Sequence, residues 1–383
     1  MKKLFFISLC ILCIGAYAQD AALITGWTVQ ENIYPEVSGT AINPQMGSAA
    51  IVGDYLYVIG GNNGYDGDTA RVIKFQIDPY TGSVTFGVET TTLPTSANFC
   101  YLYETVDVFN DFIYIGGGGY NSTGPNRDEV TYIKSLSSGD LDTAWTESTA
   151  FPTTPRVYDP ELGGMVITEA GYLYMFGGDG EATTTFDECY YAKVNTDGSL
   201  GAWQTGTTLP NTFWFPGVCA VGNDIIVHGG ILDDKASANS TDKIWVCQTS
   251  GSDGSMGSWV EQTEKLPMTH YNGSMVAAGN TIFMVGGRIP GDGDSRDTVW
   301  RATYDAGTHT VGAWTQVDAQ LPVATQYHQA VYSPESKSIY VTNIRNRFDD
   351  NATNFYPNAV YISSPLFDRP AILSADNAWS LYE

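Results

Sequence analysis

The chain has 383 residues, with 18 lysines and arginines against 42 acidic residues and a formal net charge of −24. A surface this acidic repels nucleic-acid phosphates, and it repels anionic lipid headgroups in the same way. We therefore expect a protein that binds no nucleic acid and inserts into no membrane, and whose charge serves solubility.

Residues 1–18 have the pattern of a secretory signal peptide. A basic Met-Lys-Lys start is followed by an apolar stretch over residues 4–14, and residues 16–18 (Ala-Tyr-Ala) form a small-x-small cleavage site. The apolar stretch is too short to span a bilayer. We expect cleavage near Ala18-Gln19 and an extracytoplasmic location, periplasmic or secreted. Because the segment carries two lysines and no acid, the mature net charge is near −26.

The first repeated feature is an aromatic residue followed seven or eight positions later by an apolar-Pro pair. It occurs six times, at intervals of 55 to 59 residues: Trp27…Pro35, Phe86…Pro94, Trp145…Pro152, Trp203…Pro210, Trp259…Pro267 and Trp314…Pro322. A period of this length indicates one supersecondary unit copied in tandem.

The second repeated feature is a short apolar run that ends in a glycine pair. The copies are YLYVIGG (55–61), FIYIGGGG (112–119), YLYMFGGDG (172–180), DIIVHGG (224–230) and TIFMVGGR (281–288), with SIYVTNI (338–344) as a sixth that lacks the glycines. Runs rich in β-branched and aromatic residues predict strands. Successive positions are apolar, so we expect both faces of each strand to be covered, as in a sheet packed between two others.

Each repeat contains two further predicted strands. One precedes the glycine-pair strand, at residues 47–52, 105–109, 165–170, 218–221, 274–278 and 329–332. One follows it, at residues 128–134, 187–194, 242–248, 297–304 and 357–362. Asp-Gly turns such as Asp197-Gly198 and Asp253-Gly254 then lead into the aromatic strand. Four antiparallel strands per repeat make one propeller blade.

The order of strands at the two ends of the repeat region predicts how the ring closes. The first aromatic strand, residues 25–31, precedes the first glycine-pair strand, whereas no aromatic strand follows residues 357–362. An open ring would expose an unpaired edge. We therefore predict an all-β, six-bladed propeller over residues 19–363, with four antiparallel strands per blade. The N-terminal strand completes the last blade, and residues 364–383 form a tail.

Glycine pairs after an apolar strand, with a tryptophan on the outer strand, resemble kelch repeats, as in kelch propellers and the central domain of galactose oxidase. The resemblance covers about residues 25–363, and the sixth repeat departs from it by lacking the glycine pair. The resemblance implies the fold, but kelch propellers include enzymes, adaptors and binding modules. A six-bladed extracytoplasmic kelch protein of nearly this length also resembles the sialic-acid mutarotase (N-acetylneuraminate epimerase) group.

Loops after the glycine pairs and loops after the apolar-Pro pairs are predicted to share one face of the disc, which we name the loop face. These loops hold many aromatic residues and seven of the nine arginines. Aromatic rings stack on sugars or anchor peptides, and the planar arginine fork suits carboxylates. The candidate ligand-binding residues are Arg156, Tyr158, Trp214, His270, Tyr271, Arg288, Tyr327, His328 and Arg345. Rings that plug the channel and arginines that pair with local acids are the alternatives.

Two histidines on the loop face, His270 and His328, each lie beside a tyrosine. By resemblance, two histidines and two tyrosines are the ligand set of a galactose-oxidase-like copper oxidase, with Cys100 as a thioether partner. The mutarotase resemblance instead implies acid–base catalysis, for which either histidine would serve beside Arg288 or Arg345. Zinc spacings, nucleophile elbows and phosphate or dinucleotide loops are all missing, so we expect no cofactor and no bound metal.

The other histidines and the cysteines have structural interpretations. His228 is predicted to be a hydrogen-bonded core residue, and His309 lies on the opposite face. The four mature cysteines are Cys100, Cys189, Cys219 and Cys247. They allow three disulfide pairings that sequence cannot rank, although the last three lie in predicted strands, which favours buried thiols.

The function predicted from these observations is ligand binding by a monomeric module. Carbohydrate, acidic or neutral, is slightly preferred over a protein partner, because the aromatic residues of the loop face are interleaved with arginines and acids. A mutarotase-type isomerase and a copper oxidase are the alternatives, so the sequence leaves open whether the protein is an enzyme.

Overall fold

The computed structural model describes residues 22–37, 40–41, 47–61, 70–94, 105–117, 130–150, 163–178, 186–232, 239–290, 295–342, 344 and 359–367. These residues form the predicted six-bladed propeller, and no α-helix occurs among them. Accordingly, no described helix has the length and apolar character needed to cross a membrane. The predicted signal peptide and most of the tail lie outside the described residues.

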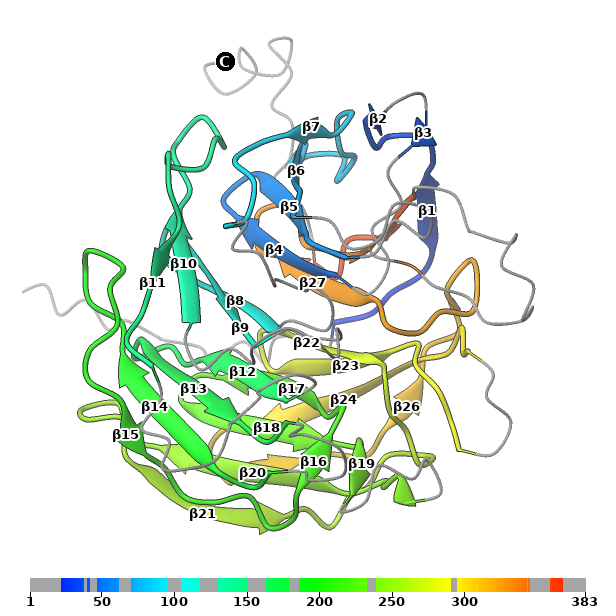
Figure 1. Ribbon diagram of the computed structural model, residues 1–383. Coiled ribbons are helices and arrows are strands. Elements are labelled where there is room, and N and C mark those ends of the chain that lie inside the picture. The colour runs from blue at the N-terminus through cyan, green and yellow to red at the C-terminus, as the bar shows by residue number, and fades with distance from the viewer. Residues whose placement is uncertain are drawn as a thin grey trace, which may run out of the picture.

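Each blade is an antiparallel sheet with its first strand near the axis and its last at the rim (Figure 1). Blade 1 consists of β4 (Ser48–Val52), β5 (Tyr55–Ile59), β6 (Val72–Gln76) and β7 (Val88–Glu89), and blade 2 of β8 (Thr105–Phe109), β9 (Phe112–Gly116), β10 (Val130–Lys134) and β11 (Thr146–Glu147). Blade 3 consists of β12 (Gly164–Ile167), β13 (Tyr172–Phe176), β14 (Cys189–Lys193) and β15 (Gln204–Thr205), and blade 4 of β17 (Gly217–Val221), β18 (Asp224–His228), β20 (Ile244–Thr249) and β21 (Met256–Glu261).

The last two blades complete the ring. Blade 5 consists of β22 (Ser274–Ala278), β23 (Thr281–Val285) and β24 (Val299–Asp305), and both β25 (Thr310–Val311) and β26 (Thr315–Gln316) pair with β24. Blade 6 consists of β27 (Gln329–Ser333), β28 (Ser338–Thr342), β29 (Val360–Ser363) and β1 (Trp27–Gln30). The first strands of neighbouring blades contact one another around the whole axis.

The predicted closure by the N-terminal strand is confirmed. Strand β1 runs antiparallel to β29, from Trp27 opposite Ser363 to Gln30 opposite Val360. Just upstream, the Ala22 N–H donates to Thr281 Oγ1 (3.2 Å), and the Ala22 carbonyl accepts from Arg301 (2.9 Å). The N-terminal segment therefore ties blade 6 to blade 5.

Six apolar clusters hold the described blades together, one between each pair of neighbours. All five residues of β13 are buried: Leu173 and Met175 pack towards blade 2, whereas Tyr172, Tyr174 and Phe176 pack towards blade 4. Successive side chains of a strand point to opposite faces. The continuous apolar pattern of these strands thus reflects a sheet covered on both sides, as predicted.

The second glycine of a pair joins its blade to the next blade through its backbone N–H. The bonds run from Gly178 to the Phe213 carbonyl (3.2 Å), from Gly230 to His270 (2.8 Å) and from Gly287 to Thr325 (2.8 Å). The pair has left-handed φ values, 58° at Gly229 and 83° at Gly230. A Cβ atom at Gly229 would also lie 2.5 Å from the His270 carbonyl oxygen. Glycine is needed here for both reasons.

Three of the five tryptophans in or beside the outer strands bond to the preceding blade, whereas the indole N–H groups of Trp145 and Trp314 have no hydrogen-bond partner among the described residues. The bonded indole N–H groups donate from Trp203 to the Thr149 carbonyl (2.8 Å), from Trp259 to Thr207 (3.1 Å) and from Trp27 to Ala319 (3.0 Å). Each acceptor stands two residues before the apolar-Pro pair of the preceding repeat. The aromatic residue of one repeat and the apolar-Pro segment of the repeat before it are therefore structural partners.

A tyrosine in the second strand makes a third bond between blades. Its hydroxyl donates to a turn glycine of the next blade: Tyr57 to Gly139, Tyr114 to Gly198, Tyr174 to Gly254 and Tyr340 to Gly82, each at 2.8 Å. Blade 4 has Ile226 at this position. There Tyr304 of blade 5 donates to the Asp224 carboxylate (2.7 Å), and His309 Nδ1 lies 2.7 Å from the same oxygen.

Some elements differ from the prediction. The outer strands of blades 1, 2 and 3 have only two residues, because a rim strand is paired on one side and exposed on the other. Two small sheets were not predicted: β2 (Glu36–Val37) with β3 (Thr40–Ala41), and β16 (Phe213–Trp214) with β19 (Ile231–Leu232). Trp214, expected outside any strand, therefore lies in one.

The described cysteines are free thiols. Cys189, Cys219 and Cys247 are buried in β14, β17 and β20, whereas Cys100 lies outside the described residues.

The start of the predicted tail packs on the propeller. Leu366 is buried in the cluster between blades 5 and 6, and its N–H donates to the Lys337 carbonyl (2.7 Å).

Candidate functional site

Six of the nine candidate residues are described, and all six lie in the loops of blades 4 to 6. They are Trp214, His270, Tyr271, Arg288, Tyr327 and His328. Arg156, Tyr158 and Arg345 lie outside the described residues. The structure thus describes the loop face for one half of the disc. There, the turn at the glycine pair of one blade bonds to the loop that leads into the first strand of the next blade.

In blades 4, 5 and 6, the loop that leads into the first strand has a residue other than glycine in the left-handed conformation. Phe215, Asn272 and Tyr327 each stand two residues before a first strand and have φ values of 56°, 55° and 52°. Left-handed backbone is uncommon for residues other than glycine, and such conformations cluster at functional sites. The Tyr327 N–H donates to the Asn272 carbonyl (3.1 Å), which joins the loops of blades 5 and 6.

Aromatic rings from blades 4 and 6 meet above the axis. The Phe215 ring centroid lies 4.6 Å from that of Trp214 and 5.5 Å from that of Tyr327. All three rings are half-buried. Pro216 directly follows Phe215, and Gln329 begins β27 two residues after Tyr327; both line the axial cavity described below. The aromatic cluster of Trp214, Phe215 and Tyr327 thus lies at the loop-face end of the axis.

Arg288 is a buried cation held against an aromatic ring. Its guanidinium carbon lies 5.3 Å from the Tyr271 ring centroid, and the two backbones exchange N–H···O bonds of 3.1 and 2.8 Å. The residue is only 9% exposed, and no described carboxylate forms an ion pair with it. Its Nε also has no hydrogen-bond partner. A buried guanidinium without an anionic partner is a feature of anion-binding sites.

The histidines of this region are buried and neutral. His270 is 1% exposed, and its Nε2 lies 2.6 Å from the Gly286 carbonyl, so this nitrogen carries the proton. Burial lowers the pKa of His270 to about 4. Burial also lowers the pKa of His328 to about 3, and that of His228 well below its usual value.

His228 was predicted to be a hydrogen-bonded core residue, and only its burial is confirmed. It is fully buried at the end of β18, but neither ring nitrogen has a hydrogen-bond partner. Its ring lies 5.8 Å from that of His270, between centroids. In the described part of the chain, no three His, Cys, Asp or Glu side chains are placed to hold a metal ion together.

Buried polar atoms without partners gather in the same loops. They include Trp214 Nε1, Arg288 Nε, the ring nitrogens of His328 and the side-chain amide atoms of Asn272 and Gln326. Buried polar groups of folded proteins nearly always bond to protein, water or a ligand. These loops therefore have donors and acceptors that the described protein atoms leave unused.

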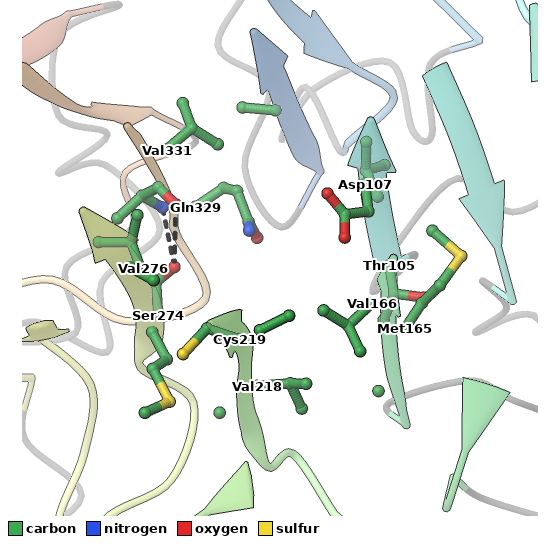
Figure 2. Close-up of a pocket in the computed structure, with 18 of the residues that line it drawn as sticks. Thr105, Asp107, Met165, Val166, Val218, Cys219, Ser274, Val276, Gln329 and Val331 are labelled. Atoms are coloured by element: carbon green, nitrogen blue, oxygen red, sulfur yellow. Dashed lines mark hydrogen bonds between the residues drawn. The ribbon is translucent and has the colours of Figure 1, made fainter. Parts of the chain in front are cut away.

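A cavity of about 450 Å³ follows the axis of the propeller, lined by the first strands of all six blades (Figure 2). At its loop-face end lie the polar side chains of Thr105, Ser274 and Gln329. Two residues further along each first strand, equivalent positions form one layer: Ala50, Asp107, Val166, Cys219, Val276 and Val331.

Asp107 is the only carboxylate among the described residues that line this cavity. Its Oδ2 accepts the Ile167 N–H of the neighbouring blade (2.6 Å), and its Oδ1 accepts the Val108 N–H (2.7 Å). Burial raises the pKa of Asp107 to about 6, against the opposing effect of these two bonds. The side chain keeps partial exposure, because the cavity reaches it.

Sequence reasoning missed Asp107, although a signal was present. When the repeats are aligned, the equivalent positions hold alanine, valine or cysteine, and only TVDVF (105–109) has an acid there. A single charge in an otherwise apolar layer is the kind of departure that marks a functional position.

No protein-family model matches the sequence. A search of the curated proteins finds no match either. What is established for this chain is the architecture, a six-bladed β-propeller closed by its N-terminal strand.

Proposed function

We propose that this protein is a kelch-type propeller that acts outside the cytoplasm as a carbohydrate-binding module. The sugar would lie on the loop face of blades 4 to 6. The observation that carries the proposal is the aromatic cluster of Trp214, Phe215 and Tyr327 beside unpartnered polar atoms of Asn272 and Gln326. Sugars present apolar faces edged by hydroxyl groups, which need rings to stack on and donors and acceptors beside them.

The kelch-type part of the proposal is supported by what the repeated residues do. At three blade boundaries the second glycine of a pair bonds to the next blade, and three of the outer tryptophans bond to the preceding blade. These repeated residues therefore make the same contact between blades at several boundaries of the ring. The extracytoplasmic location is supported by the predicted signal peptide alone.

Arg288 favours a sugar that carries a carboxylate. The guanidinium is fixed on the Tyr271 ring, is nearly buried, and has no carboxylate partner in the described structure. Arginine can grip a carboxylate with two parallel hydrogen bonds, which a neutral hydroxyl cannot match. A neutral sugar would leave this cation uncompensated.

Binding is favoured over catalysis because the histidines are poorly suited to proton transfer. Both His270 and His328 are buried, with pKa values of about 4 and 3, so they stay neutral near pH 7. The protonated nitrogen of His270 is engaged by the Gly286 carbonyl. A general acid–base pair works best with pKa values near the working pH and within reach of substrate.

A glycan array containing neutral and acidic glycans, followed by calorimetry, tests the proposal. We expect Trp214→Ala and Arg288→Gln to weaken binding at least about tenfold, or ~1.4 kcal/mol each. Trp214→Phe should retain most of the affinity, because a ring remains to stack. Tyr80→Ala, on an exposed turn at the opposite face, is the matched control and should bind like the wild type.

Two results would contradict the proposal. If no glycan binds the folded wild-type protein, the ligand class is wrong. If a glycan binds but the folded Trp214→Ala and Arg288→Gln variants bind it equally well, the site is wrong. If NMR shows that the protein accelerates mutarotation of the sugar it binds, the protein is an isomerase and not only a binding module.

A further inference from the structure

The axial cavity, which begins beside the aromatic cluster of the loop face, has an uneven lining. Its loop-face end carries three uncharged polar side chains, Thr105, Ser274 and Gln329, whereas the layer below holds three valines and Ala50 beside Asp107 and Cys219. Ser274 Oγ already accepts the Ala330 N–H (2.9 Å). Most of the remaining lining is alanine, valine, isoleucine and methionine. The surface of this cavity of about 450 Å³ is nevertheless more polar than apolar, so it suits a small ligand that combines a polar or charged group with a short hydrocarbon part.

Asp107 brings a negative charge into this cavity without a positive partner. The described residues that line the cavity include no lysine, arginine or histidine, and none of the described cations forms an ion pair with Asp107. A carboxylate offers about four acceptor positions, of which the two backbone N–H groups occupy two. Figure 2 shows the carboxylate turned into the cavity. Acceptor capacity therefore remains on the cavity side.

The other titratable groups in the lining do not offset this charge. Cys219 lies in the same layer, and burial together with Asp107 raises the pKa of its thiol. Tyr332 lies at the far end, and burial raises its pKa to about 12. Both stay neutral below pH 8. The strands beside β8, namely β4 and β12, place no titratable side chain in the cavity.

The walls indicate which kind of cation fits. A calcium or magnesium ion needs several oxygen ligands, and the described residues provide no cluster of three metal-binding side chains. An ammonium group needs one carboxylate and a few uncharged acceptors, which Asp107 and Gln329 supply. We infer that the axial cavity binds a small organic cation, a protonated amine whose ammonium group donates to Asp107 and whose short hydrocarbon part lies beside the alanine and valine side chains of the lining.

The experiment is calorimetric titration of the full-length protein with n-butylammonium chloride, and with 1-butanol as the neutral analogue of the same length. We expect saturable one-to-one binding of the amine at pH 8. At pH 5 the affinity should fall roughly tenfold, because the carboxylate, with a pKa of about 6, is then mostly protonated. Binding of 1-butanol should be weaker and should not change between these pH values.

Two variants place the ligand. Asp107→Asn should lose at least about tenfold in amine affinity at pH 8, together with the pH dependence. Val331→Phe keeps the carboxylate but fills the cavity from blade 6, so it should also lose binding. A cooperative thermal transition of Val331→Phe would show that this variant folds. If Asp107→Asn does not fold, Val331→Phe alone tests whether the amine binds in the cavity.

Several results would overturn the inference. They are the absence of saturable amine binding to the wild-type protein, equal binding of 1-butanol, and unchanged amine binding in folded Asp107→Asn or Val331→Phe. Glycan binding on the loop face is measured separately, so failure of one site leaves the other standing.

Discussion

At the scale of single residues, Asp107 is the most informative side chain. Its carboxylate links blade 2 to the Ile167 N–H of blade 3, a task that Ser274 performs between blades 5 and 6 with an uncharged hydroxyl. A carboxylate here must lose part of its hydration, and this raises its pKa to about 6. The charge therefore costs stability in the free protein, which makes a structural role alone a poor explanation for it.

The raised pKa of Asp107 predicts a pH-dependent stability. Because the folded-state value exceeds the unfolded value of 3.8, the native state holds the proton more tightly, and this contribution to stability is lost as pH rises from about 4 to 7. We expect a loss of about 1 to 3 kcal/mol from this group. The measurement is the free energy of unfolding in urea at several pH values.

Asp107→Asn isolates that contribution from those of the other carboxylates. The difference between wild type and variant should shift in favour of the variant as pH rises from 4 to 7. A difference that stays constant over this range would show that the carboxyl group titrates normally.

At the scale of elements, the glycine pair is a backbone device that joins blades. Gly229 and Gly230 turn the chain at the end of β18, and the Gly230 N–H reaches the His270 carbonyl at the entry to blade 5 (2.8 Å). The same bond recurs at two other described boundaries, which are Gly178 to Phe213 and Gly287 to Thr325. The pair thus determines where a neighbouring loop lies, and with it the loop face.

Gly229→Ala should therefore destabilise the protein more than alanine does at a left-handed glycine where a Cβ atom has free space. Gly53→Ala is the matched control: Gly53 has φ 54° against 58° at Gly229, but a Cβ there would meet no atom within 4 Å. We expect about 1 to 2 kcal/mol from left-handed backbone in both variants. Gly229→Ala should lose about 1 to 3 kcal/mol more, because the Cβ would meet a backbone carbonyl.

Urea unfolding of the two variants checks this difference. Equal destabilisation would mean that the corner can move away from His270 and that the close approach is not required.

At the scale of the whole molecule, stability depends on a contact between segments far apart in the chain. Strand β1 pairs with β29, and the adjacent Thr25 N–H donates to Ser364 Oγ (2.8 Å) across a sequence separation of 339 residues. Ala22 and Ile24 are buried in the cluster between blades 5 and 6. Without this segment, β29 would become an exposed edge and that cluster would open to water.

Deletion of residues 1–30 should therefore abolish the cooperative thermal transition or cause self-association, whereas deletion of residues 1–21 should leave a folded monomer. Circular dichroism and light scattering after size exclusion distinguish these outcomes. A monomer with an unchanged melting temperature after the longer deletion would show that the ring does not need its closing strand.

Much of this fold could be predicted from local patterns. The apolar run of β13 recurs in all six repeats with the spacing of a blade, and the Gly229-Gly230 pair and the Trp203 indole each recur in five of them. Their number and order predicted six blades closed by the N-terminal strand. Each of these residues is constrained by its own strand and nearest blade, and such constraints repeat in the sequence with the repeat itself.

The arrangement at the axis and on the loop face was decided only by the tertiary structure. The stacking of Arg288 on Tyr271, the contact of Phe215 with Tyr327 and the exposure of Asp107 to the cavity each depend on how separate blades are placed. Periodicity shows that a strand exists, but the pairing register and the packing of blades determine which of its side chains face the axis. The repeats therefore predict the ring, whereas the position of a ligand site depends on how the blades pack around the axis.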